Sequence, residues 1–181
     1  MMTQDPTPAV YLQRPCYHSQ YNVPPCEPYL WTHGRYSETV VSSLEAAIEA
    51  LVAERRPSSL TLIGYSGGGV LAYLLAARVE SVQALVTIAA NLDTEAWADH
   101  HGYEPLLGSL SPATEPVLPT HIHQSHWVGG RDLNVPPALI ESVLRNQPNA
   151  RLNVVPELDH ACCWGERWPE MLRQVVAASR P

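Results

Sequence analysis

The chain has 181 residues, of which 45% are hydrophobic and 16% are charged, and its formal net charge is −7. These values are typical of a globular protein with a buried core and argue against a disordered chain. The acidic balance, without any cluster of Lys and Arg, argues against nucleic acid as a partner. No apolar run reaches the roughly 20 residues that span a bilayer, and the first residues lack a signal-peptide pattern.

Hydrophobic spacing predicts strands that alternate with helices along a single domain over residues 1–181. The first elements are a short β-prone segment at 9–12 and a helix over 39–55 that Pro57 ends. Residues 91–120 are expected to be irregular because of their prolines. The remaining elements are strands at 60–64, 84–89, 121–128 and 151–155, and helices at 70–79, from Pro136-Pro137 to about 146, and at 168–179. Most strands are continuous apolar runs, which indicates an α/β fold with a mostly parallel sheet and helices on both faces.

The stretch GYSGGG at 64–69 places one serine between glycines, directly after an expected strand and before an expected helix. Gly64, Ser66 and Gly68 fit the pattern G-x-S-x-G, whose structural context is a sharp turn that exposes a nucleophilic serine. Side chains at 64 and 68 are expected to collide with the neighbouring strand and helix. The Gly67 N–H, at the helix N-terminus, is expected to donate to an oxyanion. The alternative is a strand–helix turn in which Ser66 has no chemical role.

A nucleophilic serine needs a base that an acid orients. Asp132 in VGGRDLNVPP and His160 in VVPELDHACCW each follow an expected strand. Because the loops after parallel strands open on one edge of a sheet, Ser66, Asp132 and His160 are expected to converge there. Asp93 also follows a strand and is the alternative acid, while Asp132 could instead be a turn residue or a helix N-cap. Asp159 is adjacent to His160 and is badly placed to hold its ring.

Three other histidines, His121, His123 and His126, form the pattern H-x-H-x-x-H. On a strand, His121 and His123 share a face, which would allow metal binding. Paired surface or half-buried histidines are the commoner explanation of such a pattern, so we expect no metal site.

The four cysteines leave the redox state open. Cys16 and Cys26 lie in a proline-rich loop with nine residues between them, so they can close as a disulfide. In the cytosol, all four cysteines would stay reduced. Cys162 and Cys163 are adjacent in the chain and would need an unusual geometry to bond each other.

Several segments together resemble a bacterial α/β-hydrolase family that is found mostly in proteobacteria. They are YLQRPC, WTHGRYSETVV, LIGYSGGG, IAANLDTEAWADHHGYEPLLGSLSPA, VGGRDLNVPP and DHACCW, and the resemblance runs from about residue 9 to the end. It implies an α/β-hydrolase fold with Ser66 as nucleophile, Asp132 as acid and His160 as base. Many members look exported or lipid-anchored, which favours the Cys16–Cys26 disulfide and suggests the periplasm or cell envelope.

The front of the sequence departs from that family. Members have further N-terminal strands and a GDG-like turn that resembles the usual second donor of the oxyanion hole. Here the chain opens just before what resembles the family's fourth strand. Residues 9–12 must then pair with the strand at 60–64 or leave a sheet edge exposed. Either the sequence is N-terminally truncated, or a short chain lacks one donor, which costs about 100- to 1,000-fold in rate.

Together these features predict a serine hydrolase that acts on an ester or other acyl bond of a small molecule, with no metal or organic cofactor. Segments 29–36 and 91–111 are expected to cover the site and shape its pocket. There are two alternative functions. One is a catalytically weak or inactive binding protein of the cell envelope, and the other is an acyltransferase that uses the same three residues. The substrate and the oligomeric state do not follow from the sequence.

Overall fold

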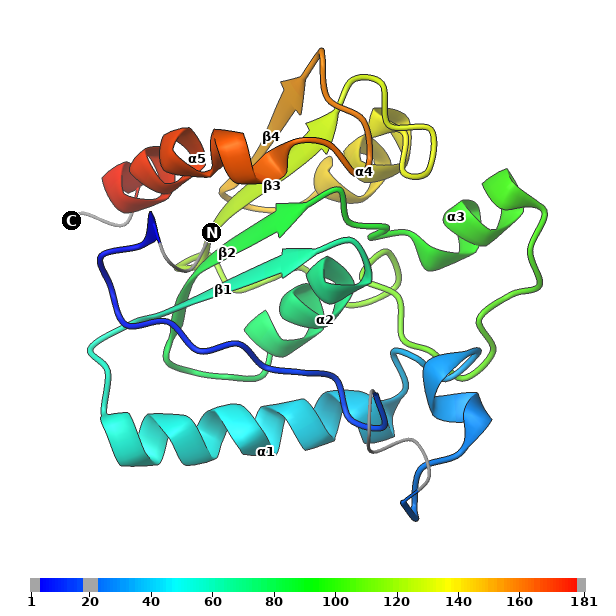
Figure 1. Ribbon diagram of the computed structural model, residues 1–181, viewed down its shortest axis with the longest axis horizontal. Coiled ribbons are helices and arrows are strands. Elements are labelled where there is room, and N and C mark those ends of the chain that lie inside the picture. The colour runs from blue at the N-terminus through cyan, green and yellow to red at the C-terminus, as the bar shows by residue number, and fades with distance from the viewer. Residues whose placement is uncertain (1–3, 18–22, 179–181) are drawn as a thin grey trace.

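Four parallel strands form the centre of the molecule in a computed structural model, which describes residues 4–17 and 23–178. The sheet order is β1-β2-β3-β4, and each neighbouring pair is parallel. The strands are β1 (Leu60–Tyr65), β2 (Val82–Ile88), β3 (His123–Gly129) and β4 (Ala150–Val155). Since all four run in one direction, the loops that follow them leave from the same edge of the sheet (Figure 1).

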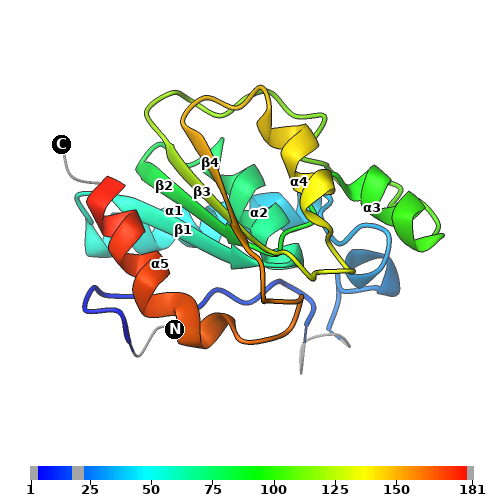
Figure 2. The same cartoon turned by 90° about the horizontal axis from the view of Figure 1, so that it is seen from above.

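Helices cover both faces of this sheet, as the continuous apolar strands predict. They are η3 (Pro28–Trp31), α1 (Glu38–Arg55), α2 (Gly67–Ala76), α3 (Thr94–His101), α4 (Pro137–Leu144) and α5 (Trp164–Ala178). Figure 2 shows α5 on one face and both α2 and α4 on the other. Within the described residues, no helix is long and apolar enough to cross a membrane.

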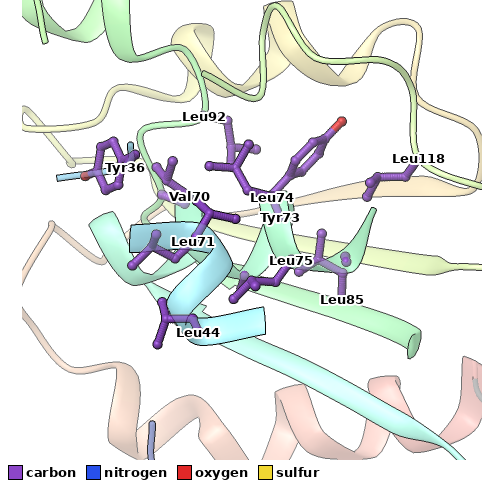
Figure 3. Packing of buried hydrophobic residues seen from close by; sticks show 14 of the residues in the cluster. Tyr36, Leu44, Val70, Leu71, Tyr73, Leu74, Leu75, Leu85, Leu92 and Leu118 are labelled. Atoms are coloured by element: carbon purple, nitrogen blue, oxygen red, sulfur yellow. The ribbon is translucent and has the colours of Figure 1, made fainter. Parts of the chain in front are cut away.

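The larger part of the core lies between the sheet and helices α1 and α2 (Figure 3). Helix α2 is apolar nearly all round because it is enclosed by the sheet on one side and by α1 on the other, so Val70 and Tyr73 are fully buried. A second cluster on the α5 face contains Trp127, Trp164 and Trp168. The two clusters fix α2 and α5 against the sheet, and these are the helices that follow the predicted serine and histidine.

The segment at 9–12, which the sequence predicts as a strand, is not one. Its backbone forms no ladder with β1, and Val10 and Tyr11 are mostly exposed while Leu12 packs against the core. Strand β1 is therefore an edge of the described sheet, and every second side chain on it is exposed. High β-propensity alone does not make a strand, since a strand also needs a neighbour to accept its hydrogen bonds.

Helix α3 lies inside the stretch that the sequence predicts to be irregular. Asp93 caps its first turn, with the carboxylate accepting the Ala96 N–H at 2.9 Å, and Gly102 ends it with a φ of 64°. An N-cap aspartate followed by a C-terminal glycine is a local helix signal that the prolines further along obscure. Helix α5 likewise begins at Trp164, four residues earlier than predicted. The burial of two tryptophan rings outweighs the helix-disfavouring Gly165 and Pro169.

The N-terminal segment is joined to the body of the protein by a disulfide between Cys16 and Cys26, whose Cα atoms lie 5.3 Å apart. Cys16 is buried and belongs to the main core, and Cys26 packs against it. The bond therefore holds the chain at Cys26, just before η3, against the same cluster that contains residues of α1 and α2.

A polar group lies deep in the sheet at His126, which is fully buried. Its Nδ1 lies 2.8 Å from the Thr87 hydroxyl and its Nε2 lies 3.3 Å from the Gln124 side-chain oxygen. One neutral tautomer satisfies both contacts, because Nε2–H donates to Gln124 and Nδ1 accepts from Thr87. Burial lowers the pKa of His126 from 6.5 to about 3, so the folded protein keeps this ring uncharged.

Acid should therefore destabilise the fold through His126. Below pH 6.5 the His126 ring binds a proton in the unfolded chain, whereas in the folded chain it does so only near pH 3. The contribution of this ring to the free energy of unfolding is therefore fully present above pH 6.5 and is lost as the pH falls. We expect a loss of about 1.4 kcal/mol per pH unit within this window from this ring. Urea unfolding at a series of pH values measures it. His126→Gln should flatten the slope, whereas the same change at exposed His123 should leave it; equal slopes in all three proteins would contradict the assignment.

Candidate active site

Ser66 occupies a sharp turn between β1 and α2. Its backbone has φ 50° and ψ −126°, a conformation that non-glycine residues rarely adopt. The Ser66 N–H donates to the Ile88 carbonyl at the end of β2 at 2.8 Å, which anchors the turn to the neighbouring strand. Gly67 begins α2, so its N–H is among the first-turn donors that the helix itself cannot use. The strained turn expected at the serine is present, and it directly precedes the first N–H of α2.

The glycines around Ser66 are needed at partly different positions from those predicted. A Cβ on Gly64 would overlap the backbone carbonyl of Gly68, as expected, because strand and helix approach closely there. The expectation for Gly68 itself is wrong, since an added Cβ meets nothing within 4 Å. The crowded helix position is Gly69, where a Cβ would overlap the side chain of Ala90. A Cβ on Gly67 would lie 2.6 Å from the Tyr36 hydroxyl.

Ser66, Asp132 and His160 lie together at the carboxyl edge of the sheet. The His160 Nε2 is 3.1 Å from the Ser66 Oγ, and its Nδ1 is 2.9 Å from the Asp132 Oδ2. The carboxylate of Asp132 is fully buried, and its other oxygen accepts the N–H groups of Asn134 at 2.9 Å and Val135 at 2.7 Å. These donors offset the cost of burying the charge and hold the carboxylate in one orientation.

The backbone of His160 is fastened separately from its ring. Its carbonyl accepts the Tyr65 hydroxyl at 2.7 Å and the Trp164 indole N–H at 3.1 Å. Asp159 shapes the same loop, because its carboxylate accepts the N–H groups of Ala161 at 2.9 Å and Cys162 at 2.8 Å. Those two donors, that of Cys162 first, lower the pKa of Asp159. Asp159 is therefore a turn residue beside His160, consistent with the expectation that it does not hold the ring.

Helix α3 contacts the loop that contains Asp132. The Trp97 indole N–H donates to the Asn134 side-chain oxygen at 3.1 Å, and the His101 Nε2 lies 2.8 Å from the Asn134 carbonyl. The His100 Nε2 lies 3.1 Å from the Leu133 carbonyl. We call these three contacts the α3 latch. The sequence does not predict these contacts, because each joins residues more than 30 positions apart and has no local pattern.

The two segments that the sequence predicts to cover the site form a pocket of about 260 Å³ between them. It is bounded by residues of the loop before α1 and by residues from α3 to the segment after it. Its lining residues are Thr32, His33, Arg35, Trp97, Tyr103, Glu104 and Leu106. Trp97 thus belongs both to this pocket and to the α3 latch.

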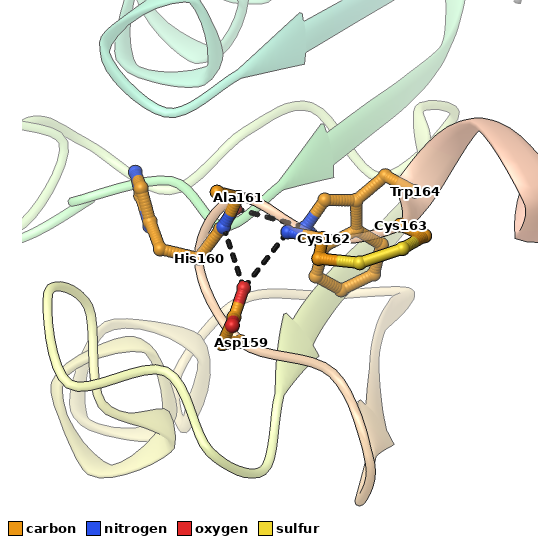
Figure 4. Close-up of a disulfide and its surroundings, with 6 residues drawn as sticks. All are labelled: Asp159, His160, Ala161, Cys162, Cys163 and Trp164. Carbon is orange, nitrogen blue, oxygen red and sulfur yellow. Dashed lines mark hydrogen bonds between the residues drawn. A yellow bond between two sulfur atoms is a disulfide. The ribbon is translucent and has the colours of Figure 1, made fainter.

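The histidine loop contains a second disulfide, between Cys162 and Cys163 (Figure 4). The unusual geometry that adjacent cysteines need is present here, with a cis peptide bond between the two residues. The pair lies two and three residues after His160 and immediately before α5. Figure 4 shows the disulfide together with Trp164, the residue that follows it in the chain.

The other candidate residues lie apart from this site or serve the fold. Asp93 caps α3. His121 lies in a turn before β3, so it does not share a strand face with His123, and His126 is buried against Thr87. Within the described part of the chain, no three His, Cys, Asp or Glu side chains gather as metal ligands.

Comparison with known proteins defines the class first. A solved α/β-hydrolase enzyme from the sediment metagenome of the Mar Chica lagoon in Morocco aligns with 74% of this chain and 68% of its own, with a TM-score of 0.56 and 20% identity. An esterase of Pyrococcus furiosus aligns over 81% of this chain and 63% of its own, with a TM-score of 0.59 and 16% identity. An α/β-fold hydrolase of Bacillus anthracis aligns over 82% and 76%, with a TM-score of 0.58 and 13% identity. At these identities the likeness shows the fold alone, which is that of the α/β hydrolases.

The family follows from the sequence itself. The model of the dienelactone hydrolase family matches residues 8–167, so the chain belongs to that family. No curated protein matches the chain. The chain spans 68% and 63% of the first two solved structures named above, so part of their length has no counterpart here.

The revised assignment of the glycines predicts different tolerance at neighbouring positions. Gly68→Ala should fold with nearly wild-type stability, because its Cβ would have free space and alanine favours a helix. Gly64→Ala and Gly69→Ala should each lower the free energy of unfolding by about 1–3 kcal/mol through overpacking. Urea denaturation of the three variants measures the difference. A Gly68→Ala variant as unstable as Gly64→Ala would show that the helix start is more crowded than described.

Proposed function

We propose that this protein is a serine hydrolase that cleaves an ester or another acyl bond of a small molecule. The observation that supports this most is the continuous contact from Asp132 through His160 to Ser66, with heavy-atom distances of 2.9 and 3.1 Å. Membership of the dienelactone hydrolase family supports the same class of reaction. The acid, base and nucleophile also follow each other in the chain order that α/β hydrolases use with serine first, then acid, then histidine.

The proposed roles follow from the hydrogen bonds. Nδ1 of His160 faces a carboxylate, which only accepts, so Nδ1 carries the hydrogen and the Nε2 lone pair faces the Ser66 hydroxyl. His160 then takes the hydroxyl proton as Ser66 attacks the acyl carbonyl, and later gives that proton to the leaving group. Asp132 holds the ring in this tautomer and stabilises the imidazolium that forms.

Gly67 is the proposed oxyanion donor from this part of the chain. Its N–H stands at the N-terminus of α2, where the helix dipole favours negative charge. The tetrahedral intermediate develops that charge on the former carbonyl oxygen, next to Ser66. The strained turn at Ser66 supports this role, because it places the serine directly before the first N–H of α2.

Covalent labelling with a fluorophosphonate tests the proposal. The probe phosphonylates only an activated serine, so the wild-type protein should be labelled at Ser66, as mapped by mass spectrometry. Ser66→Ala should abolish labelling, and Asp132→Asn should slow it by about 10,000-fold because the tautomer is no longer enforced. Labelling of a folded wild-type protein at another serine, or none, would contradict the assigned nucleophile. Adding an alcohol or amine acceptor to an ester assay then separates a hydrolase from an acyltransferase by the product formed.

The α3 latch should influence the same reaction without touching the substrate's acyl group. His101→Ala removes a hydrogen bond to the loop of Asp132, and such a bond is worth about 1 kcal/mol. We expect labelling of Ser66 to slow by about fivefold, which is the corresponding change in rate. The matched control is His121→Ala, in the turn before β3 at the opposite edge of the sheet. Equal labelling rates for the two variants would show that α3 does not position the acid.

A further inference from the structure

The Cys162–Cys163 disulfide contributes little to holding the chain together. A disulfide stabilises a fold mainly by closing a loop of the unfolded chain, and the effect grows with the length of that loop. The Cys16–Cys26 bond closes a loop of sequence separation 10, whereas Cys162 and Cys163 are consecutive and enclose no loop. Chain stabilisation therefore does not explain the second bond, and its position offers a different explanation.

The two disulfides also differ in their access to solvent. Cys162 is exposed and Cys163 is half-buried, whereas Cys16 is buried in the main core. Thiol–disulfide exchange requires a thiolate to approach one sulfur of the bond. Cys162 is the exposed member of the four cysteines, since Cys26 is half-buried like Cys163 and Cys16 is buried. We therefore expect a thiolate to approach the second bond at Cys162 more readily than either sulfur of the first.

The exposed pair is linked to the histidine of the active site by the backbone on both sides. On one side, the Cys162 N–H donates to Asp159 at 2.8 Å, within the turn that contains His160. On the other side, the Cys163 carbonyl accepts the Glu166 N–H at 3.0 Å in the first turn of α5. The next residue, Trp164, donates its indole N–H back to the His160 carbonyl at 3.1 Å. The disulfide thus lies in the short stretch of backbone that joins the turn of Asp159 and His160 to α5.

We propose that Cys162–Cys163 is a thiol-exchange site for small dithiols, and that its reduction loosens the His160 loop and slows the reaction at Ser66. The second part rests on the proposed function. One thiolate of the dithiol attacks Sγ of Cys162, the S–S bond breaks, and Cys163 leaves as a thiolate that takes a proton. The second thiol of the reagent then displaces Cys162 from the mixed disulfide. The dithiol is oxidised to its disulfide, and the protein gains two electrons and two protons as two cysteine thiols.

Selective reduction tests the exchange step, with the Cys16–Cys26 bond as the control within the same molecule. The wild-type protein is equilibrated with graded dithiothreitol, alkylated with iodoacetamide and analysed by peptide mass spectrometry. We expect Cys162 and Cys163 to be alkylated at concentrations that leave Cys16 and Cys26 bonded. Opening of Cys16–Cys26 first, or of both bonds together, would overturn the assignment of a distinct exchange site.

The effect on the site is measured on the selectively reduced protein. Its fluorophosphonate labelling at Ser66 should be about 10- to 100-fold slower than in the oxidised protein, because a misplacement of about 1 Å costs on the order of 100-fold. The Cys162→Ser/Cys163→Ser variant should label at that slow rate with or without dithiothreitol. The matched Cys16→Ser/Cys26→Ser variant should still respond to the reagent. Unchanged labelling after reduction would overturn the link to His160.

A readout that does not depend on activity separates failure of this inference from failure of the proposed function. The ring resonances of His160 in NMR spectra should shift between the oxidised and the selectively reduced wild-type protein, while those of His126 in the sheet should not. If Ser66 is never labelled and the His160 resonances shift, the proposed function fails and the redox link stands. If the His160 resonances stay in place, the redox link is wrong whatever Ser66 does.

Discussion

The close approach of strand β1 to helix α2 is the constraint on which the site depends. Without side chains at Gly64 and Gly69, the chain reverses tightly enough for Ser66 to stand in a strained conformation at the sheet edge. The surrounding structure maintains that strained conformation. Helix α2 is packed between the sheet and α1, and the Ser66 N–H donates to the carbonyl of Ile88 in β2. The apolar character of α2 therefore serves the site as much as the core, since a loosely packed helix would let the turn relax.

The proposed acid and the proposed base are held near Ser66 by different means. Asp132 is buried and held by backbone donors of its own loop, and that loop is fastened from outside by α3. His160 keeps a partly exposed ring, and its backbone is fastened by Tyr65, Trp164 and the turn of Asp159. A buried charge needs fixed donors, because it has no water to compensate it. In its proposed role as base, His160 needs a ring that can adjust slightly, and its backbone is the part that is held.

Much of this arrangement could be predicted from the sequence, because the information was local. Continuous apolar runs marked the parallel strands, and the order of Ser66, Asp132 and His160 behind those strands marked the site. The errors arose where neighbours in space decided the outcome. Residues 9–12 have the propensity of a strand but no partner, and Gly69 is constrained by Ala90, which lies more than twenty positions further along the chain. The α3 latch and the Tyr65 contact join separate segments, and no spacing within one segment reveals them.

The loop of Asp132 and the loop of His160 are held by different kinds of interaction, hydrogen bonds from α3 in the first and a disulfide within the loop in the second. The loop of Asp132 is held by hydrogen bonds from α3, and Trp97 of that helix also lines a pocket. The base loop contains a covalent bond between consecutive cysteines that does not constrain the unfolded chain. A bond of this kind can open while the sheet and both core clusters stay intact, because none of their side chains belongs to it. The proposed exchange site therefore lies next to His160 and outside both core clusters, whereas the Cys16–Cys26 bond belongs to the main core.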